Sequence, residues 1–465
     1  MAETNRSVAI VGAGPVGLAA AAHALERGLR PIVFEAGSEA GASVRAWSHV
    51  QLFSPWEFNV DKAATRLLAG AGWNSPDPAR YPTGRELLEV YLQPLATRTT
   101  LKDHIRTDSR VTGISRVGFD KVKTHGRAEA PFEIRYRNGE DVRSVTADAV
   151  IDASGTWLTP NPAGANGLPA NGEVEAGARV AYGMPDMRGA ERSRYAGRSV
   201  AVLGAGHSAV GTLVDLAALA ETDPATRIIW LLRGSDPAKS FGGGVNDALA
   251  ARGELGSMLA RLVEEGKIEV ETGFRVGRLA VTSDGLRIDA HAAAGNRHII
   301  VDELVVAAGF RPQLNFLGEL RLSLDPALDC PPLLAPLIDP NEHSCGTVRP
   351  HGARELSQPE PGFYFAGMKS YGRAPTFLML TGYEQARSIV AEIAGDHEAA
   401  RRVELVLPET GVCSTSRASR SASDCCADPN GIDRLKEEGT VMASGMGGCR
   451  SPKQDQMAKQ NACCG

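Results

Sequence analysis

Two glycine-rich turns, each set between an apolar run and a helix-forming run, constrain this chain more than any other feature. The first, residues 12–17, reads Gly-Ala-Gly-Pro-Val-Gly and follows the apolar run Ser7–Val11. The second, residues 204–209, reads Gly-Ala-Gly-His-Ser-Ala and follows Ser199–Leu203. In this context glycines let the backbone approach a pyrophosphate, and the first amides of the helix bind its charge. The sequence therefore predicts two dinucleotide-binding units.

The residues after the first turn point to an adenosine. A second predicted strand, Pro31–Phe34, ends on Glu35. That acid lies about 20 residues past the glycines, where a carboxylate accepts hydrogen bonds from the ribose hydroxyls. We therefore expect Gly12, Gly14, Gly17 and Glu35 to bind one dinucleotide, which we interpret as FAD.

The second unit repeats this order but ends differently. After a predicted helix over residues 209–220, the strand 227–232 ends on Arg233 in place of an acid. A guanidinium at this position attracts the extra phosphate of NADPH, whereas a carboxylate repels it. The alternatives are a strand-end arginine that lies in solvent and a His207 that only begins the helix. The predicted NADPH-binding residues are Gly204, Gly206, His207, Ser208, Ala209 and Arg233.

Each turn also has a later partner strand, which indicates an internal duplication. The apolar runs 149–154 and 304–308 stop at Gly155 and Gly309, which we assign to cofactor binding. Polar and apolar residues alternate before each run, at 132–136 and 286–290, as in antiparallel strands. The sequence predicts an α/β protein with two nested Rossmann-like dinucleotide-binding domains and small antiparallel β-meanders.

The order of the motifs gives domain boundaries. We expect the first part of the FAD domain at 1–162, the NAD(P)H domain at 163–310, the second part of the FAD domain at 311–408, and a flexible cysteine-rich tail at 409–465. A late predicted strand at 362–367 and a helix at 381–394 complete the FAD domain. In two-dinucleotide enzymes this unit directs amides and a helix dipole at the flavin. We therefore add Gly367 and Met368 to the cofactor residues.

The composition narrows the classes of partner that we expect for this chain. The 465 residues carry 50 basic and 55 acidic side chains, a net charge of −5, so the sequence predicts no nucleic-acid partner. No apolar run is long enough for a bilayer, and the first strand begins within ten residues, which leaves no room for a signal peptide. We expect a cytoplasmic protein with no membrane partner, and its oligomeric state stays open.

The cysteines are crowded at one end. Only Cys330 and Cys345 precede residue 413, and the body has no closely spaced pair for dithiol chemistry. The tail holds two vicinal pairs, Cys425-Cys426 and Cys463-Cys464. Thiolates are soft ligands for trivalent arsenic, mercury or copper(I), so these four residues form the predicted metal site. The alternative is a reduced tail with no assigned task.

Longer strings carry a family resemblance. Residues 53–56, 337–347, 369–378 and 407–413 resemble the flavin-dependent monooxygenases of bacterial arsenic-resistance operons, and the double turn resembles flavin-containing monooxygenases and thioredoxin reductase-like flavoproteins. The resemblance covers residues 6 to about 413. Two departures stand out. The signature histidine of flavin-containing monooxygenases is missing from Val180–Met187, and a methionine follows Gly367 where disulfide reductases place an aspartate.

The resemblance implies an NADPH-dependent FAD oxidoreductase that uses dioxygen to oxygenate a small soft nucleophile, an arsenic, sulfur or nitrogen compound. Candidate catalytic donors are His49, Lys369 and Arg373, because they flank segments expected to face the flavin. Each has a structural or phosphate-contacting alternative. Two rival hypotheses remain. The first is a metal or metalloid reductase with a thiol-rich collecting tail, since the terminal pair resembles that of mercuric reductases. The second is a non-catalytic sensor of redox state or arsenite.

Overall fold

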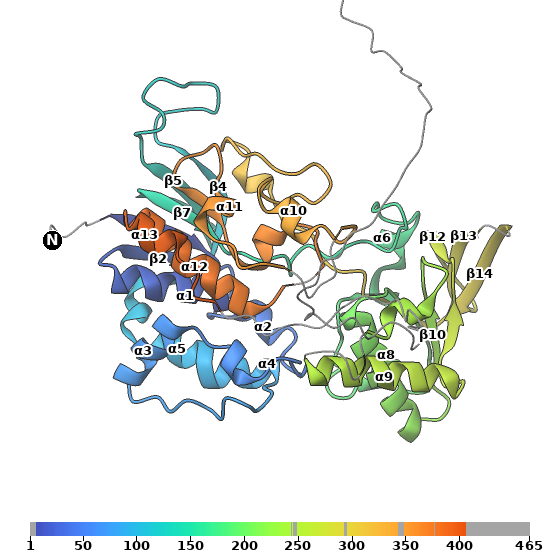
Figure 1. Cartoon of the computed structure of the whole chain (residues 1–465). Helices are drawn as coiled ribbons and strands as arrows, with labels where there is room; N and C mark the ends of the chain where they lie inside the picture. The colour runs from blue at the N-terminus through green and yellow to red at the C-terminus, as the bar shows by residue number, and fades with distance from the viewer. Residues whose placement is uncertain are drawn as a thin grey trace, which may run out of the picture. The chain divides into compact units, whose positions relative to one another are not determined.

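The computed structural model describes residues 6–242, 244, 249–292, 295–342, 348–375 and 377–405. Within these residues the chain forms two parallel five-stranded sheets and two antiparallel three-stranded sheets. Figure 1 labels strands and helices of both parts. The predicted tail and its cysteines Cys425, Cys426, Cys463 and Cys464 lie outside the described residues. The α/β class with two nested dinucleotide-binding domains is confirmed.

The first sheet is built from both ends of the described chain. Its strand order is β16-β7-β1-β2-β3, and all neighbours are parallel. The strands are β1 (Ser7–Val11), β2 (Arg30–Phe34), β3 (Ile105–Arg106), β7 (Ala149–Asp152) and β16 (Phe363–Phe365). Because β16 pairs with β7 more than 200 residues earlier, the second sheet is an insertion within the first domain.

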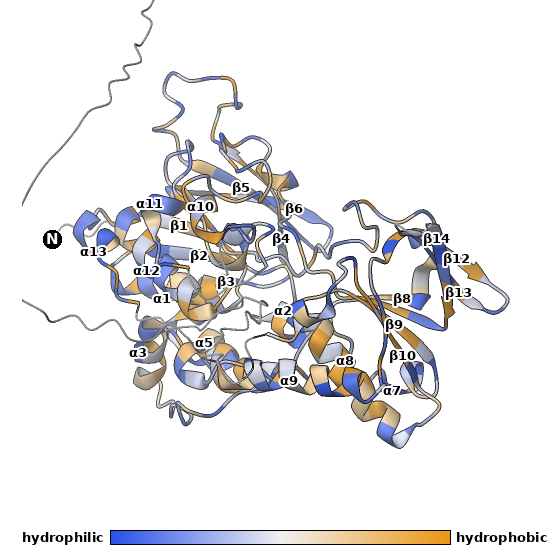
Figure 2. Cartoon of the chain, turned by 45° about the vertical axis from the view of Figure 1, so that its right-hand side comes forward, coloured by the Kyte–Doolittle hydropathy of each residue, from blue (hydrophilic) through white to orange (hydrophobic). Residues whose placement is uncertain are grey.

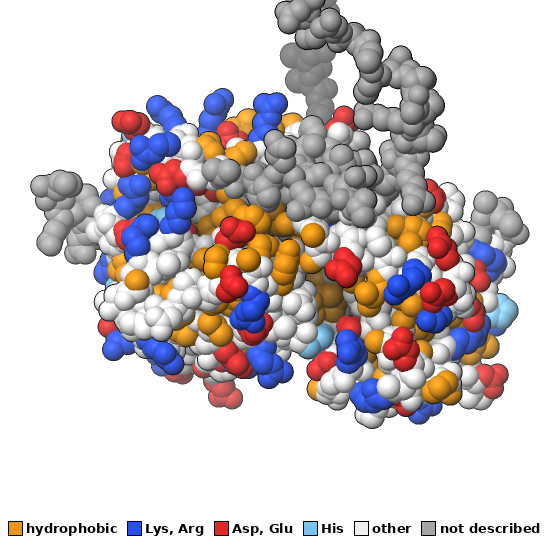
Figure 3. Space-filling view, turned by 60° about the horizontal axis from the view of Figure 1, so that its bottom comes forward, with side chains coloured by type: hydrophobic (Ala, Val, Ile, Leu, Met, Phe, Trp, Pro, Cys, Tyr) orange, Lys and Arg blue, Asp and Glu red, His pale blue; other side chains and the backbone are white. Residues whose placement is uncertain are grey.

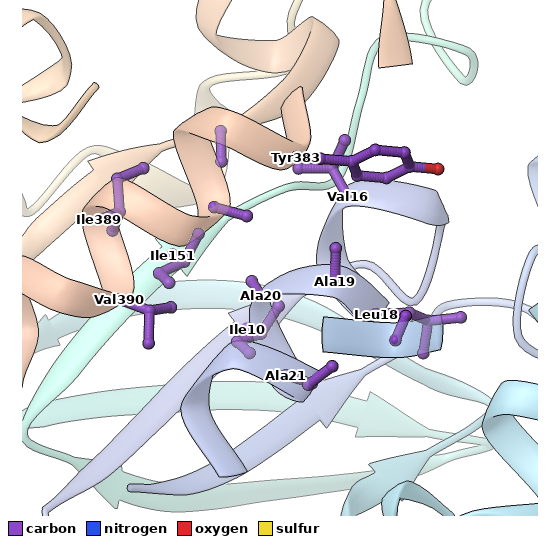
Figure 4. Packing of buried hydrophobic residues seen from close by; sticks show 14 of the residues in the cluster. Ile10, Val16, Leu18, Ala19, Ala20, Ala21, Ile151, Tyr383, Ile389 and Val390 are labelled. Carbon is purple, nitrogen blue, oxygen red and sulfur yellow. The ribbon is translucent and has the colours of Figure 1, made fainter. Parts of the chain in front are cut away.

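Two helices pack together on the first sheet. Helix α1 (Pro15–Glu26) begins directly after the first glycine turn, and α12 (Met379–Ile393) follows β16 in the chain. The run Ala19–Ala22 in α1 is fully buried, and short side chains let the helix lie close to its neighbours. Figure 4 shows Ala19, Ala20 and Ala21 near Ile10 of β1, and Tyr383 of α12 beside Val16. The helix predicted at 381–394 is therefore confirmed, with its start two residues earlier.

The second sheet has the same design as the first. Its order β11-β10-β9-β15-β8 corresponds to that of the first sheet read from the other end, and its neighbours are also parallel, but its edge strand β8 precedes the glycine turn whereas β16 comes last in the chain. The strands are β8 (Val180–Tyr182), β9 (Ser199–Leu203), β10 (Arg227–Leu231), β11 (Glu269–Glu271) and β15 (Glu303–Val306). Helix α8 (His207–Thr222) starts at the second glycine turn, and Figure 2 shows hydrophobic residues along β9, β10 and much of α8. The predicted duplication is confirmed.

A meander accompanies each parallel sheet. The first consists of β4 (Ser109–Arg116), β5 (Phe132–Asn138) and β6 (Asp141–Ala147), and the second of β12 (Arg275–Thr282), β13 (Gly285–Ala292) and β14 (Gly295–Val301). Both sit between a parallel sheet's early strands and its later partner strand in the sequence, as predicted. The alternation in β5 buries Phe132, Ile134 and Tyr136 and leaves Arg135 and Arg137 exposed.

The remaining elements are mostly short. The longer ones are α3 (Lys62–Gly70), α9 (Ala250–Glu264) and a continuous helical stretch made of α4 (Gly84–Glu86), the π-helical turn η2 (Leu87–Leu92) and α5 (Gln93–Arg98). The others are α2 (Ala42–Arg45), η1 (Trp56–Phe58), η3 (Thr100–His104), α6 (Glu173–Ala176), η4 (Gly177–Arg179), α7 (Arg192–Tyr195), η5 (Pro237–Ser240), η7 (Asn315–Leu317), α10 (Ala335–Ile338), α11 (Ala353–Leu356), η8 (Gly367–Tyr371) and α13 (His397–Arg401).

The surface of the described chain carries charges of both signs. On the face drawn in Figure 3, apolar side chains gather near the middle, and acidic and basic side chains are mixed around them. None of the helices in the described ranges has the length and apolar character needed to cross a bilayer.

A buried ionic cluster holds the loop before β16 against the first meander. Glu360 is fully buried, and its carboxylate accepts hydrogen bonds from Arg116 (Nε, 2.8 Å) and Arg127 (Nη1, 2.6 Å). The amide of Arg321 adds a third bond of 3.0 Å. Burial raises the pKa of Glu360, but the Arg321 amide and the two guanidinium groups together hold it below its usual value. The cluster therefore holds the negative charge of Glu360 buried against the positive charges of Arg116 and Arg127.

Replacing Glu360 with glutamine should strongly destabilise the protein. The change keeps the shape but leaves Arg116 and Arg127, whose side chains are both 3% exposed, without their carboxylate, which costs about 3–5 kcal/mol of unfolding free energy. Urea denaturation measures this loss. The control Glu133→Gln removes a surface partner of Arg135 and should cost about 0–1 kcal/mol. Equal losses in the two variants would contradict the assigned role of the cluster.

Candidate cofactor site

In the first glycine turn, two of the three glycine positions have no room for a side chain. Gly12 has φ +98°, and a Cβ there would lie 2.8 Å from the carbonyl oxygen of Ala153. A Cβ on Gly17 would lie 1.9 Å from the carbonyl oxygen of Gly12. Gly14 differs, because no atom lies within 4 Å of its Cβ position. The first and third glycines thus permit the close packing of the turn, and the second faces open space.

Glu35 is held in place by the same turn. Its Oε2 accepts a hydrogen bond from the amide of Ala13 (2.9 Å), and its Oε1 accepts one from the amide of Gly37 (2.8 Å). The residue is 8% exposed, and burial raises the pKa of its carboxyl group against the opposing effect of these amides and of the Arg110 charge. Glu35 therefore presents a fixed pair of acceptor oxygens at the end of β2.

A cavity of about 400 Å³ opens at this turn. Six of the predicted cofactor residues line it together: Gly12, Gly14, Glu35, Gly155, Gly367 and Met368. Gly17 lies behind the lining, where it allows α1 to approach the turn. Gly155 has φ +66° and no atom within 4 Å of its Cβ position, so it too leaves space for a ligand.

The rest of the lining is largely aromatic or apolar. Its members include Trp47, Trp157, Phe310, Phe316, Pro375, Phe377 and Met379. The lining also includes Arg110, which belongs to β4 and lies near Glu35. The sequence reasoning missed these residues, because they come from loops and helix ends with no motif of their own. A cavity with an acid, open glycines and helix amides at one end and flat apolar side chains elsewhere fits FAD, whose adenosine and diphosphate are polar and whose isoalloxazine ring is flat.

The second glycine turn repeats the geometry of the first. A Cβ on Gly204, whose φ is +147°, would lie 2.3 Å from the carbonyl oxygen of Ala307, which follows β15 as Ala153 follows β7. Gly206 has no atom within 4 Å of its Cβ position and precedes His207, the exposed first residue of α8. Ala209 is fully buried where the first turn has Gly17, and Ser208 lies in the first turn of α8.

Arg233 lies just beyond the carboxyl end of β10, where Glu35 lies in the first unit. Its side chain is exposed, and Nη1 donates a hydrogen bond of 3.3 Å to the carbonyl oxygen of Ala165. By strand register Leu232 corresponds to Glu35, and Arg233 lies one residue later, so the two strand ends carry opposite charges at neighbouring places.

The two crossings between the nested domains are bound to each other. Pro160 and Phe310 form an antiparallel bridge, and the amide of Asn161 donates to the carbonyl oxygen of Gly309 (2.9 Å). The rings of Trp157 and Phe310 stack with centroids 4.9 Å apart. Gly309 thus lies in the crossing itself, with φ +86°, and the stacked pair forms part of the cavity lining.

The catalytic candidates are not brought together by the structure. The Lys369 side chain is fully buried behind the lining, 3.2 Å from Asp152 Oδ2, and its Nζ donates to the carbonyl oxygen of Gln313 (2.6 Å). Lys369 therefore contacts residues that line the cavity, and its ammonium group is enclosed by them. Arg373 is exposed and paired with Asp329.

His49, the third catalytic candidate, lies apart from Lys369 and Arg373. Its ring is half-buried, and its Nε2 is a buried atom with no hydrogen-bond partner among the described residues. Burial raises the pKa of Asp215 on α8, and the charges of Arg188 and His49 oppose that rise. His49 thus faces the helix that begins at the second glycine turn. Nearby in the chain, Phe53 packs its ring 5.4 Å from that of His207.

The one cysteine within the described ranges is not a nucleophile. Cys330 is fully buried, and burial together with nearby aspartates raises the pKa of its thiol to about 12. A thiol in this state stays protonated, and the thiolate is the reactive form. The predicted pairs in the tail lie outside the described residues.

Comparison with known proteins gives remote relatives. The flavin-containing monooxygenase FMO GS-OX-like 2 of Arabidopsis thaliana is 24% identical over 245 residues, which are 47% of this chain and 48% of the plant protein. Flavin-containing monooxygenase 3 of Rattus norvegicus is 25% identical over 159 residues, which are 34% of this chain and 29% of the rat protein. The match thus spans about half or less of each curated relative.

Solved structures share the fold over most of the chain. The bacillithiol disulfide reductase of Bacillus cereus has a TM-score of 0.61 at 18% identity and covers 84% of this chain and 99% of its own. The cadaverine monooxygenase of the desferrioxamine pathway of Erwinia amylovora has a TM-score of 0.58 at 13% identity, with coverages of 89% and 99%. At these identities the likeness concerns the fold alone.

The family model described as pyridine nucleotide-disulphide oxidoreductase matches residues 9–331. This range includes both glycine turns, both meanders and the whole second sheet. The chain therefore belongs to the pyridine nucleotide-disulphide oxidoreductase family and is a flavoprotein oxidoreductase whose cofactors are FAD and NADPH.

Proposed function

We propose that this protein is an NADPH-dependent flavin monooxygenase that acts on a small soft nucleophile, an arsenic, sulfur or nitrogen compound. The observation that carries the proposal is the cavity at the first glycine turn, which has a polar end shaped for a dinucleotide and an aromatic, apolar remainder. Apolar walls exclude water from a reacting centre, which oxygen transfer requires if it is to avoid waste of the reductant. Among the relatives, flavin-containing monooxygenases support oxygen chemistry.

The chain's own residues supply binding and orientation. In the proposal Gly12, Gly14 and the start of α1 hold the FAD diphosphate, and Glu35 accepts the ribose hydroxyls. Gly204, Gly206, His207 and Ser208 hold the NADPH diphosphate in the same way, and Arg233 binds its additional phosphate. Gly155, Gly367 and Met368, together with the stacked Trp157 and Phe310, line the cavity and would contact the flavin itself.

Bound FAD supplies two-electron redox chemistry, because it accepts a hydride and passes electrons to dioxygen. Thiol-disulfide exchange, the alternative within this family, finds little support here. Cys330 is buried with a raised thiol pKa, and the sequence has no closely spaced cysteines before Cys425. Oxygenation of an arsenical and a cytoplasmic location are the finer parts of the proposal, and they rest on the strings that resemble arsenic-operon proteins.

Oxygen consumption tests the proposed reaction. Protein reduced by NADPH without oxygen is mixed with oxygenated buffer and a trivalent arsenical, a thioether or an amine. We expect one of these compounds to yield an oxygenated product with about one O₂ consumed per NADPH, because the aromatic and apolar side chains of the cavity lining limit the access of water to the reaction. NADPH oxidation that produces only hydrogen peroxide with all three classes would contradict the proposal. So would reduction of a disulfide or metal ion without oxygen.

The Gly14→Ala variant separates ligand binding from folding. The new methyl group meets no protein atom within 4 Å, so the fold should be unchanged, but it fills the space into which the diphosphate must come. We expect FAD affinity to fall by about tenfold or more, equivalent to about 1.4 kcal/mol. The control is Gly70→Ala in α3, where the Cβ position is also open and no part of the cavity lies. Equal FAD affinity in the two variants would refute the assigned diphosphate site.

Arg233 tests the choice of nicotinamide cofactor. Arg233→Ala should raise the KM for NADPH by about tenfold through loss of a charge-assisted phosphate contact, and should change the KM for NADH by less than about twofold. Arg227→Ala is the matched control, because Arg227 begins β10, the strand after which Arg233 lies, and pairs with Glu269. If both cofactors respond equally to Arg233→Ala, the arginine does not select the phosphate.

A further inference from the structure

The turn after β16 reaches the cavity through a tightly restricted backbone. Gly367 has φ +69°, and a Cβ there would lie 3.1 Å from Cγ2 of Val16 at the start of α1. Gly367 and Met368 both line the cavity. The position of this turn therefore sets how closely its backbone approaches a bound cofactor.

Both polar groups of the Gly367 backbone are bound by buried side chains. Its amide donates to Oε1 of Gln385 on α12 at 2.7 Å. Its carbonyl oxygen accepts from Oγ of Ser370 at 2.8 Å. Gln385 and Ser370 are both fully buried, so neither bond competes with water.

The buried network continues to a histidine. Nε2 of Gln385 lies 2.9 Å from Oγ of Ser370 and 2.8 Å from Nε2 of His351. Nδ1 of His351 lies 3.0 Å from the carbonyl oxygen of Arg349. His351 is 3% exposed and precedes α11, and its ring lies 5.6 Å from that of Tyr371. Three segments of the first domain, namely residues 349–351, the turn 367–370 and α12, thus meet in one chain of hydrogen bonds.

These hydrogen bonds form a relay that runs from the Gly367 amide through Gln385 and His351 to the Arg349 carbonyl. The direction of every bond in this relay follows from the groups at its two ends. The Gly367 amide only donates, so Oε1 of Gln385 is the acceptor and the amide nitrogen of Gln385 faces His351. The Arg349 carbonyl only accepts, so Nδ1 of His351 carries the proton and Nε2 offers a lone pair. The two ends agree on a neutral imidazole that accepts from Gln385. Burial lowers the pKa of His351, against the Arg349 carbonyl and the charges of Glu355 and Glu384.

We propose that His351 is a positioning residue for the cofactor, which acts through Gln385 to fix the Gly367–Met368 turn against the flavin. The inference rests on the proposed binding of FAD in this cavity. Without the acceptor at Nε2, a buried N–H of Gln385 loses its partner, and rotation of the Gln385 amide to recover one would remove the acceptor from Gly367. His351 does not itself line the cavity, but through Gln385 it controls the position of the Gly367 backbone, which does.

The test compares His351→Ala with the rescue variant His351→Gln, whose Oε1 can accept from Gln385. His104→Ala is the matched control, because His104 also bonds a backbone carbonyl, that of Pro31, outside the relay. We expect His351→Ala to weaken FAD binding by about tenfold and to change the visible absorption and fluorescence of the bound flavin. His351→Gln and His104→Ala should stay within about twofold of wild type.

Hydrogen exchange of the Gly367 amide in cofactor-free protein gives a readout that does not depend on FAD. It should accelerate in His351→Ala and return toward the wild-type rate in His351→Gln. Ser370→Ala, which removes the bond to the Gly367 carbonyl but leaves His351 in place, gives a second route to the same turn if His351→Ala does not fold; it should also weaken FAD binding.

The outcomes separate the two proposals. Wild-type protein that binds no FAD overturns the proposed function, whatever the exchange rates are. Wild-type protein that binds FAD, together with variants whose FAD affinity, flavin spectrum and Gly367 exchange are unchanged, overturns the positioning role alone. Equal losses in His351→Ala and His351→Gln also overturn it, because the role would then belong to packing of the ring and not to its acceptor nitrogen.

Discussion

The steric contact between a glycine and the strand beside it is the constraint on which the rest of this structure depends. Gly12 packs on the carbonyl oxygen of Ala153, and Gly204 packs on that of Ala307, at distances that admit no side chain. This contact sets each turn against its parallel partner strand. It also directs the start of α1 or α8, with its unpaired amides, toward the space above the sheet.

The same constraint explains why the two domains are alike in design but differ in detail. In the first, Gly17 brings α1 close to its own turn, and the buried alanines of α1 accept the packing of α12. In the second, Ala209 occupies the third position, and its Cβ lies 3.3 Å from the place that a Cβ on Gly204 would take. The strand ends then carry Glu35 and Arg233, which in the proposed function bind the uncharged ribose of FAD and the phosphorylated ribose of NADPH.

Segments distant in sequence complete the first cavity. The stacked Trp157 and Phe310 come from the two crossings between domains, and Gly367 arrives after the whole second domain has been inserted. Glu360 anchors the loop before β16 to Arg116 and Arg127, while Gln385, Ser370 and His351 hold the turn after it. The late strand is thus fixed on both sides by buried polar groups, which are costly to leave unpaired.

The sequence by itself determined the central strands of both parallel sheets, the two turns, the duplication and six residues that meet at one cavity, because glycine spacing and alternating hydrophobicity report local backbone geometry. Only the tertiary structure decided the roles of isolated polar residues. Lys369, chosen as a donor from its place in the chain, is enclosed by Asp152, Ser154 and Gln313, and His351, which no motif marked, lies in the relay behind Gly367. The reason is that burial and hydrogen-bond partners arise from contacts between distant segments, which no local pattern encodes.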